Sequence, residues 1–188
     1  MNVIETSGLG KRYGRTWALR DAALAIPAGY VVALVGPNGA GKTTLLHMSV
    51  GLTTPTTGRI TVVGSETAGS PAALDQIAFV AQDAPLYKNL STADMLHLTR
   101  NLNRRWDQQR AEARLKELNI PLDRKVGRLS GGQQAQLALT LALARRPRLL
   151  VLDEPLASLD PLARHDFMAS VMAAVAERTG CRWCCPRT

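Results

Sequence analysis

A glycine-rich segment has the residue types and the spacing of a phosphate-binding loop. It reads Gly36-Pro37-Asn38-Gly39-Ala40-Gly41-Lys42-Thr43-Thr44 and satisfies the pattern G-x-x-x-x-G-K-[ST] in full. Glycines let backbone N–H groups turn inward around phosphate oxygens, a following helix N-terminus adds positive potential, and Lys42 adds a point charge. The hydroxyl of Thr43 is expected to bind Mg²⁺. An ordinary glycine-rich turn is the alternative, and the complete pattern disfavours it.

The residues on either side predict the strand and the helix that must position this loop. Residues 31–35 form a short apolar run rich in β-branched residues, which predicts a strand. Residues 43–48 have helical spacing. A strand, a glycine loop and a helix, in this order, are the context in which the pattern binds phosphate.

Two adjacent carboxylates, Asp153 and Glu154, follow a second apolar run at residues 149–152. The run predicts a buried strand, and ligands of open α/β sheets bind at the carboxyl ends of the strands. We therefore expect both carboxylates beside the phosphate loop, with Asp153 holding the metal and Glu154 polarising the attacking water. By itself such a pair is weak evidence, because many strands end in solvent. In combination with the phosphate loop, the pair of carboxylates becomes strong evidence for a nucleotide site.

The rest of the chain predicts alternating strands and helices. Further strands are expected at residues 58–63 and 77–80, and helices at 106–118, 131–145 and 161–178, with Ser91 and Asp94 marking another helix start. This alternation predicts an α/β fold with a parallel sheet, interrupted by a helical insertion between about residues 85 and 128.

A third motif, Leu129-Ser130-Gly131-Gly132-Gln133, precedes the helix expected at 131–145. It places a second set of hydrogen-bond donors at a helix N-terminus, where an anion can bind. Together with Gln82, the phosphate loop and Asp153-Glu154, this motif resembles the ATP-binding cassette family over roughly residues 1–162. The resemblance implies a phosphate-loop NTPase core with a parallel sheet, an antiparallel N-terminal β portion and a short helical insertion.

The resemblance also implies roles for individual residues. ATP is expected along residues 36–44, with Tyr13 stacking on the adenine. Mg²⁺ would be held by Thr43, Gln82 and Asp153, and Glu154 and Gln82 would act in hydrolysis. Ser130, Gly131, Gly132 and Gln133 would cap the ATP of the opposite protomer, and Asp160, in Ser158-Leu159-Asp160, would couple the two sites. A core tyrosine at position 13 and a helix cap at Asp160 are the alternatives.

In the family, such a chain is an ATPase that works as a head-to-tail dimer on a separate membrane permease. No segment here reaches the roughly 20 apolar residues that cross a bilayer, and residues 1–5 carry no readable secretory signal. We therefore expect a cytoplasmic protein, peripheral on the inner face of the cell membrane. The insertion and residues 129–162 are similar to drug or antibiotic exporter subunits, so export is expected. One domain is expected over residues 1–188, with a nucleotide-binding core at 1–84 and 129–180 and a helical subdomain at 85–128.

The final residues, 181–188, differ in composition from the rest of the chain. They hold all three cysteines, Cys181, Cys184 and Cys185, where the resemblance implies a last strand that ends in a histidine. Reading the codons of residues 182–188 one nucleotide earlier permits an apolar strand followed by Ser-Ser-His or Pro-Pro-His. We therefore hypothesise a frameshifted, truncated chain with an aberrant tail. A zinc clip is the alternative, but a tetrahedral site needs four ligands.

Composition limits the competing functions. The chain has 23 Lys and Arg against 15 Asp and Glu, a net charge of +8, but this charge is diffuse and favours a solvated surface over a nucleic-acid partner. A soluble mechanical ATPase acting on DNA or ribosomes is thus the weaker alternative, because the chain has no long coiled coil and no second cassette. A chain that binds ATP with little or no turnover is a third possibility, because none of His47, His97 and His165 matches the position of the family's histidine.

Overall fold

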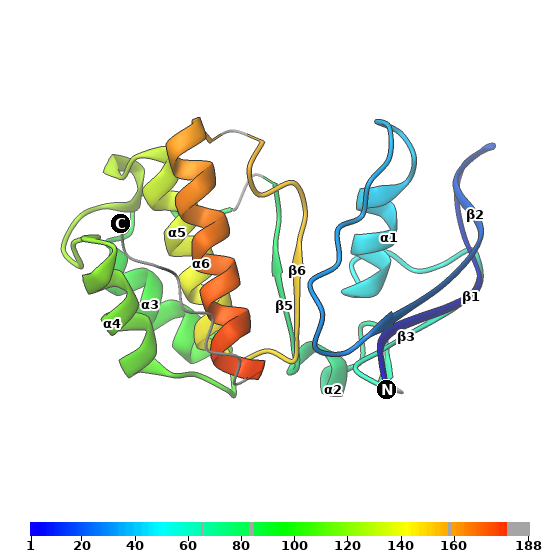
Figure 1. Cartoon of the computed structure of the whole chain (residues 1–188), viewed down its shortest axis with the longest axis horizontal. Coiled ribbons are helices and arrows are strands. Elements are labelled where there is room, and N and C mark those ends of the chain that lie inside the picture. The colour runs from blue at the N-terminus through cyan, green and yellow to red at the C-terminus, as the bar shows by residue number, and fades with distance from the viewer. Residues whose placement is uncertain (65, 83–84, 158, 180–188) are drawn as a thin grey trace.

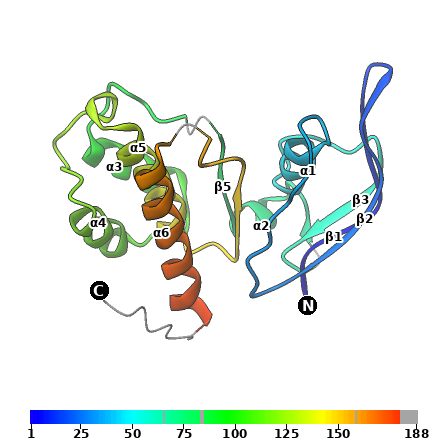
Figure 2. The same ribbon diagram turned by 45° about the horizontal axis from the view of Figure 1, so that its top comes forward.

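A two-stranded parallel sheet stands between a helical part of the molecule and an antiparallel sheet packed on a short helix (Figure 1). The computed structural model describes residues 1–64, 66–82, 85–157 and 159–179. The same three-part arrangement is visible after a turn of 45° (Figure 2).

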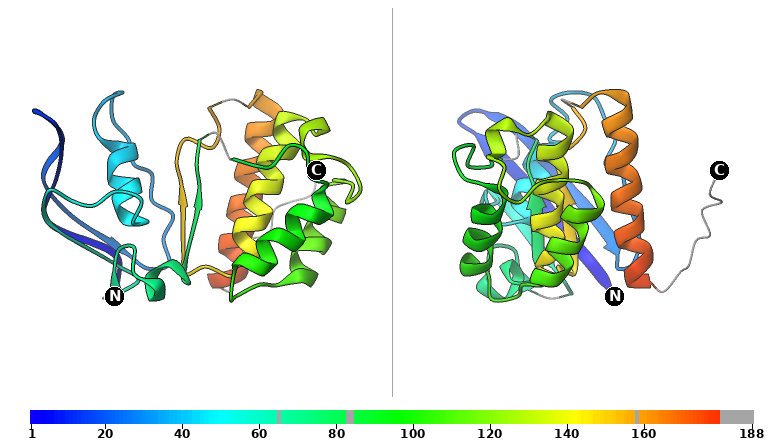
Figure 3. Two further views of the ribbon diagram at one scale, coloured as in Figure 1. Left: turned by 180° about the vertical axis from the view of Figure 1, so that it is seen from behind. Right: turned by 90° about the vertical axis from the view of Figure 1, so that its left-hand side faces the viewer.

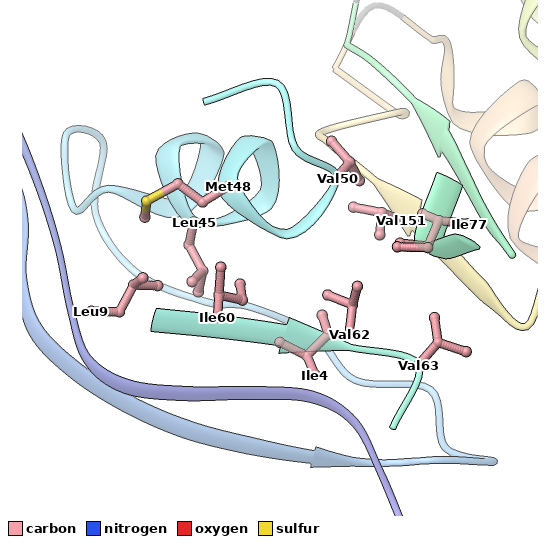
Figure 4. Close-up of a cluster of buried hydrophobic side chains, with 11 residues drawn as sticks. Ile4, Leu9, Leu45, Met48, Val50, Ile60, Val62, Val63, Ile77 and Val151 are labelled. Carbon is pink, nitrogen blue, oxygen red and sulfur yellow. The ribbon is translucent and has the colours of Figure 1, made fainter. Parts of the chain in front are cut away.

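The antiparallel sheet is built mainly from the N-terminal residues and has the strand order β2-β1-β3-β4. Its strands are β1 (Asn2–Tyr13), β2 (Thr16–Pro27), β3 (Thr57–Val62) and β4 (Glu66–Thr67). Its inner face packs on α1 (Lys42–Ser49) through an aliphatic cluster that includes Leu9, Leu45 and Ile60 (Figure 4). The antiparallel N-terminal portion and the strand expected at residues 58–63 are thereby confirmed.

The parallel sheet joins two segments that are distant in sequence. β5 (Ile77–Val80), preceded by the short helix α2 (Pro71–Leu74), pairs with β6 (Leu149–Leu152), in register from Ile77–Leu149 to Val80–Leu152. Both strands lie where the sequence predicts them. Because they are parallel and in register, the residues that follow them emerge at the same edge of the sheet.

Residues 31–35 do not form the strand that the sequence predicts. They run beside β6 (Figure 1), but they are assigned to no strand and all five are exposed. An apolar run becomes a strand only when a neighbour supplies hydrogen-bond partners for its backbone. Among the residues that the structure describes, no strand pairs with this segment.

The helical part contains α3 (Thr92–Leu102), α4 (Gln108–Glu117), a 3₁₀ turn (Val126–Arg128), α5 (Gly131–Ala144) and α6 (Pro161–Thr179). α3 begins with the predicted capping box, in which Ser91 and Asp94 accept each other's backbone N–H. α4 begins two residues later than predicted, because the carboxylate of Asp107 accepts the N–H of Arg110 and caps the helix there.

α5 forms the centre of the helical part. Leu139 and Leu143 share an apolar cluster with Phe167 and Val171 of α6, and the two helices lie side by side (Figure 3). The predictions of a helix after residue 130 and of another that begins at Pro161 are confirmed. Within the described ranges, none of the helices combines the length and the apolar character needed to cross a membrane.

Candidate nucleotide-binding site

The phosphate loop has the geometry of an open anion site at a helix N-terminus. Gly39 and Gly41 adopt φ angles of 82° and 83°, in the left-handed region that favours glycine. Gly41 is the N-cap of α1 and has no side chain that could accept the first N–H groups of the helix. These N–H groups and the helix dipole are therefore directed at any anion in the loop.

A close approach of the β1–β2 hairpin also restricts position 41 to glycine. A Cβ on Gly41 would overlap the carbonyl oxygen of Ala18 in β2. The same hairpin carries Tyr13, which pairs with Thr16, and the Tyr13 side chain is 53% exposed. The alternative of a core tyrosine is therefore wrong, and the ring is accessible for stacking.

The side chain of Lys42 turns back along the loop. Its Nζ donates hydrogen bonds to the carbonyl oxygens of Gly36 at 2.9 Å and Pro37 at 3.0 Å. These bonds hold the ammonium group inside the curve of the loop. An anionic phosphate oxygen is a stronger acceptor than a neutral carbonyl, so it can replace one of these partners.

The hydroxyl of Thr43 and the carboxylate of Asp153 meet at the edge of the parallel sheet. Thr43 Oγ1 donates to Asp153 Oδ1 at 3.1 Å. Asp153 follows β6 directly, and only 5% of it is exposed. The structure thus brings the first carboxylate to the phosphate loop, as the sequence predicts.

This pair of oxygen groups fits Mg²⁺. The ion prefers octahedral oxygen coordination, and at nucleotide sites the protein supplies only one or two of the ligands. In the part of the chain that the structure describes, no three His, Cys, Asp or Glu side chains gather into an all-protein cage. Thr43 and Asp153 would hold the ion from one side, and phosphate and water oxygens would complete its shell.

Glu154 and Gln82 extend from the same edge of the sheet. Glu154 is exposed and has a φ of 44°, a left-handed conformation that costs a non-glycine residue on the order of 1–3 kcal/mol. Gln82 is exposed and follows Val80, whose carbonyl accepts the N–H of Asp153 at 3.0 Å. The backbone thus brings Gln82, two residues after Val80, and Glu154, next to Asp153, to the same edge of the sheet, and Glu154 adopts its conformation at a cost.

The motif at residues 130–133 forms the N-terminus of α5, on the opposite side of the β5–β6 sheet from α1 (Figure 1). Ser130 Oγ accepts the N–H of Gln133, and Gln133 Oε1 accepts the N–H of Ser130, each at 3.1 Å. The two glycines differ in their surroundings. A Cβ on Gly131 would meet no atom within 4 Å, whereas a Cβ on Gly132 would lie 3.0 Å from that of Ala163.

Asp160 caps α6. Its Oδ1 accepts the N–H of Ala163 at 2.9 Å, and Pro161 is the first residue of the helix. The helix-cap alternative for Asp160 is therefore confirmed, and a coupling role of this exposed residue stays a prediction. Ser158 and the predictions for residues 181–188 lie outside the described residues.

His47 is a member of the site that the sequence interpretation missed. Its Nε2 lies 3.9 Å from Asp153 Oδ2, and its ring meets Phe79 of β5 edge-on at a centroid distance of 5.7 Å. The signal was its spacing, because His47 is four residues after Thr43 and therefore lies on the same face of α1.

The fold and the loop define a phosphate-loop nucleotide-binding domain. The model of the ABC transporter family matches residues 19–157, and the chain belongs to this family. This confirms the resemblance that the three motifs indicate.

Curated relatives show the same membership. The chain is 38% identical over 186 residues to the Fe(3+) ions import ATP-binding protein FbpC of Pseudomonas fluorescens, covering 94% of this chain and 52% of that protein. It is 37% identical over 170 residues to the sulfate/thiosulfate import ATP-binding protein CysA of Synechococcus elongatus, covering 87% and 49%. The chain thus spans about half the length of these relatives. The expectation of export is corrected here, because these relatives are named as import proteins.

Solved structures share the fold. The ATP-binding cassette MJ1267 superposes with a TM-score of 0.81 at 27% identity, covering 94% of this chain and 78% of that one. The structure of cbiO1 from Clostridium perfringens, part of the ABC transporter complex cbiONQ, gives 0.78 at 28% identity, covering 94% and 74%.

Proposed function

We propose that this chain binds ATP and Mg²⁺ and hydrolyses ATP to power a separate membrane permease. The observation that carries the proposal is the contact of Thr43 with Asp153 at the end of the phosphate loop. The relatives described above are ATP-binding proteins of importers, so import is the direction that they support.

In the proposed reaction, the N–H groups of the loop and Lys42 bind the β- and γ-phosphates. Mg²⁺, when bound, neutralises phosphate charge and orients the leaving group. Glu154, exposed at the end of β6, accepts a proton from the attacking water, and Gln82 orients that water from the neighbouring strand. Tyr13 stacks on the adenine from the hairpin that contacts the loop.

A head-to-tail dimer is part of the proposal. Ser130 and Gly131 are exposed at the N-terminus of α5, which the β5–β6 sheet separates from α1 of the same chain. Their donors can therefore serve an ATP molecule bound to a second copy. The proposal also divides the chain into a nucleotide-binding core at residues 1–84 and 129–180 and a helical subdomain at 85–128. It places the protein at the inner face of the membrane, beside the permease.

A second candidate is a chain that binds ATP with little turnover. It is favoured by the position of the described histidines, which lie on helices: His47 on α1 beside Asp153, His97 on α3, and His165 on α6, where it lies 3.5 Å from Asp166. None of the three extends from a strand beside β6.

Measuring ATP affinity and the rate of phosphate release on the same preparation distinguishes the two candidate functions. For the ATPase, Glu154→Gln keeps the affinity and lowers the rate by about 10²- to 10⁴-fold, because only general-base assistance is lost. Lys42→Ala weakens binding by about tenfold or more, since a charge-assisted partner of the phosphates is removed. Glu117→Gln on α4 is the matched control. A wild-type rate no higher than that of Glu154→Gln favours the second candidate, and equal ATP affinity of Lys42→Ala and wild type contradicts both.

A further inference from the structure

The side chain of Lys11 contacts two groups beside the β1–β2 hairpin. Its Nζ donates a hydrogen bond to the carbonyl oxygen of Thr54 at 2.8 Å and lies 5.2 Å from the centroid of the Tyr13 ring. An ammonium group at this distance over an aromatic face is attracted by the ring. Lys11 therefore connects the ring proposed to stack on the adenine with the loop that follows α1.

Lys11 and Tyr13 lie on the face of the hairpin that is directed at the phosphate loop. Lys11 is opposite Leu19 of β2, and opposite residues of an antiparallel pair share a face. Leu19 packs on the cluster that includes α1, and its Cδ1 would lie 3.4 Å from a Cβ on Gly41. Tyr13, two residues after Lys11 and in contact with it, is on the same face. The hairpin stands beside α1 in both views (Figures 1 and 2).

Backbone groups on either side of Lys11 fix the end of β1 to the same loop. The N–H of Thr56 donates to the carbonyl oxygen of Gly10 at 2.8 Å, and the N–H of Arg12 donates to Oγ1 of Thr56 at 3.1 Å. The side chain of Lys11 thus extends from a fixed strand to a fixed carbonyl. A ring that is already held in place loses less side-chain entropy when it stacks on a ligand, so its contribution to affinity is larger.

The opposite face of the hairpin carries a contact of the same kind. Arg12 follows Lys11 directly and is opposite Trp17, and its guanidinium carbon lies 5.6 Å from the centroid of the Trp17 ring. Successive residues of a strand alternate between its faces, so this contact is directed away from the phosphate loop. The hairpin thus contains two cation–π contacts, and only the contact of Lys11 with Tyr13 faces the candidate nucleotide site.

We propose that Lys11 is a positioning residue for the nucleotide base. It covers one face of the Tyr13 ring, holds the ring beside the phosphate loop and leaves the other face for the base. The inference rests on the proposed binding of ATP and adds a residue that acts through Tyr13. Because Lys11 orders the ring and not the phosphate loop, its charge should strengthen the binding of a nucleotide but not of phosphate groups without a base.

The test compares ADP with pyrophosphate by isothermal titration calorimetry on the full chain, because only ADP carries a base. Lys11→Met keeps the length of the side chain and removes its charge. We expect its ADP affinity to fall by about 3- to 10-fold and its pyrophosphate affinity to equal that of the wild type.

Two further variants locate the effect. Arg12→Met removes the matching contact on the other face of the hairpin and should change neither affinity. Tyr13→Leu removes the ring, so it should weaken ADP binding, and adding Lys11→Met to it should cause no further loss.

Several outcomes overturn the role of Lys11 and leave the proposed function intact. They are an unchanged ADP affinity in Lys11→Met, an equal loss of ADP and pyrophosphate affinity, an equal loss in Arg12→Met, and losses from Lys11→Met and Tyr13→Leu that add in full. If Tyr13→Leu binds ADP as tightly as the wild type, the stacking role of Tyr13 and this inference both fail. A wild type that binds neither ligand contradicts the proposed function itself, and this inference with it.

Discussion

Thr43 lies on the first turn of α1 and Asp153 at the end of β6, yet their side-chain oxygens are 3.1 Å apart across 110 residues of sequence. The contact joins the phosphate loop to the parallel sheet. It is the point at which a metal ion can bridge the nucleotide and the protein, and the first prediction depends on it.

Thr43→Val keeps the shape of the side chain and removes the oxygen. We expect the Mg²⁺ concentration for half-maximal ATP hydrolysis to rise by roughly 10- to 100-fold or more, because the metal loses a ligand. Titration of Mg²⁺ in an ATPase assay measures this. Thr99→Val on α3, whose hydroxyl bonds the carbonyl of Met95 at 2.8 Å, is the control. An unchanged Mg²⁺ requirement in Thr43→Val would remove Thr43 from the metal site.

The proposed head-to-tail dimer predicts complementation between two inactive variants. Lys42→Ala impairs the phosphate loop, and Gly131→Asp places a negative charge in the open space at the N-terminus of α5. In a mixed dimer, one site carries both changes and the other carries neither. Since half of the dimers are mixed, activity should recover to about a quarter of the wild-type rate. Sites formed within one chain show no recovery on mixing.

The two glycines of the motif at 130–133 are expected to respond differently to alanine. Gly132→Ala forces its Cβ to within 3.0 Å of that of Ala163, so α5 and α6 must shift, and we expect a loss of about 1–3 kcal/mol in the free energy of unfolding. Gly131→Ala meets no neighbour and should fold as stably as the parent. Urea denaturation of both variants checks this, and equal midpoints would contradict the packing role of Gly132.

Asp107 predicts a pH dependence of stability. The N–H of Arg110 and the guanidinium of Arg146 both bond this carboxylate and hold its pKa below the ordinary value of 3.8. The contribution of Asp107 is therefore fully present above the unfolded pKa and is lost as the pH falls through the lowered one. Asp107→Asn keeps a capping side chain but cannot titrate. We expect unfolding midpoints between pH 5 and pH 3 to fall less steeply in this variant than in Asp123→Asn, an exposed control.

The elements that depend on local signals were predictable. Ser91 and Asp94 predict the start of α3, because helix capping depends on residues that are close in sequence. The apolar runs at residues 77–80 and 149–152 predict β5 and β6 for the same reason. The start of α4 was predicted two residues early, because apolar spacing includes Trp106 while the cap at Asp107 decides where the helix begins.

The predicted strand at residues 31–35 failed for a different reason. The apolar run is present, but pairing is a property of two segments, and the described structure offers this run no partner. The spacing of His47 from Thr43 indicates only that both residues share one face of α1. The distance of 3.9 Å between His47 and Asp153 depends on how α1 packs against the parallel sheet.

The sequence alone predicted three features: the phosphate loop, the carboxylates after an apolar strand and the motif before α5. Each is a contiguous pattern whose chemistry depends on its own residues. Only the tertiary structure decided that Thr43 meets Asp153, that a Cβ at position 132 would crowd Ala163 while one at position 131 would not, and that residues 31–35 pair with no strand among the described residues. These relationships depend on how distant elements pack, and packing distances are not encoded in any single stretch of the chain.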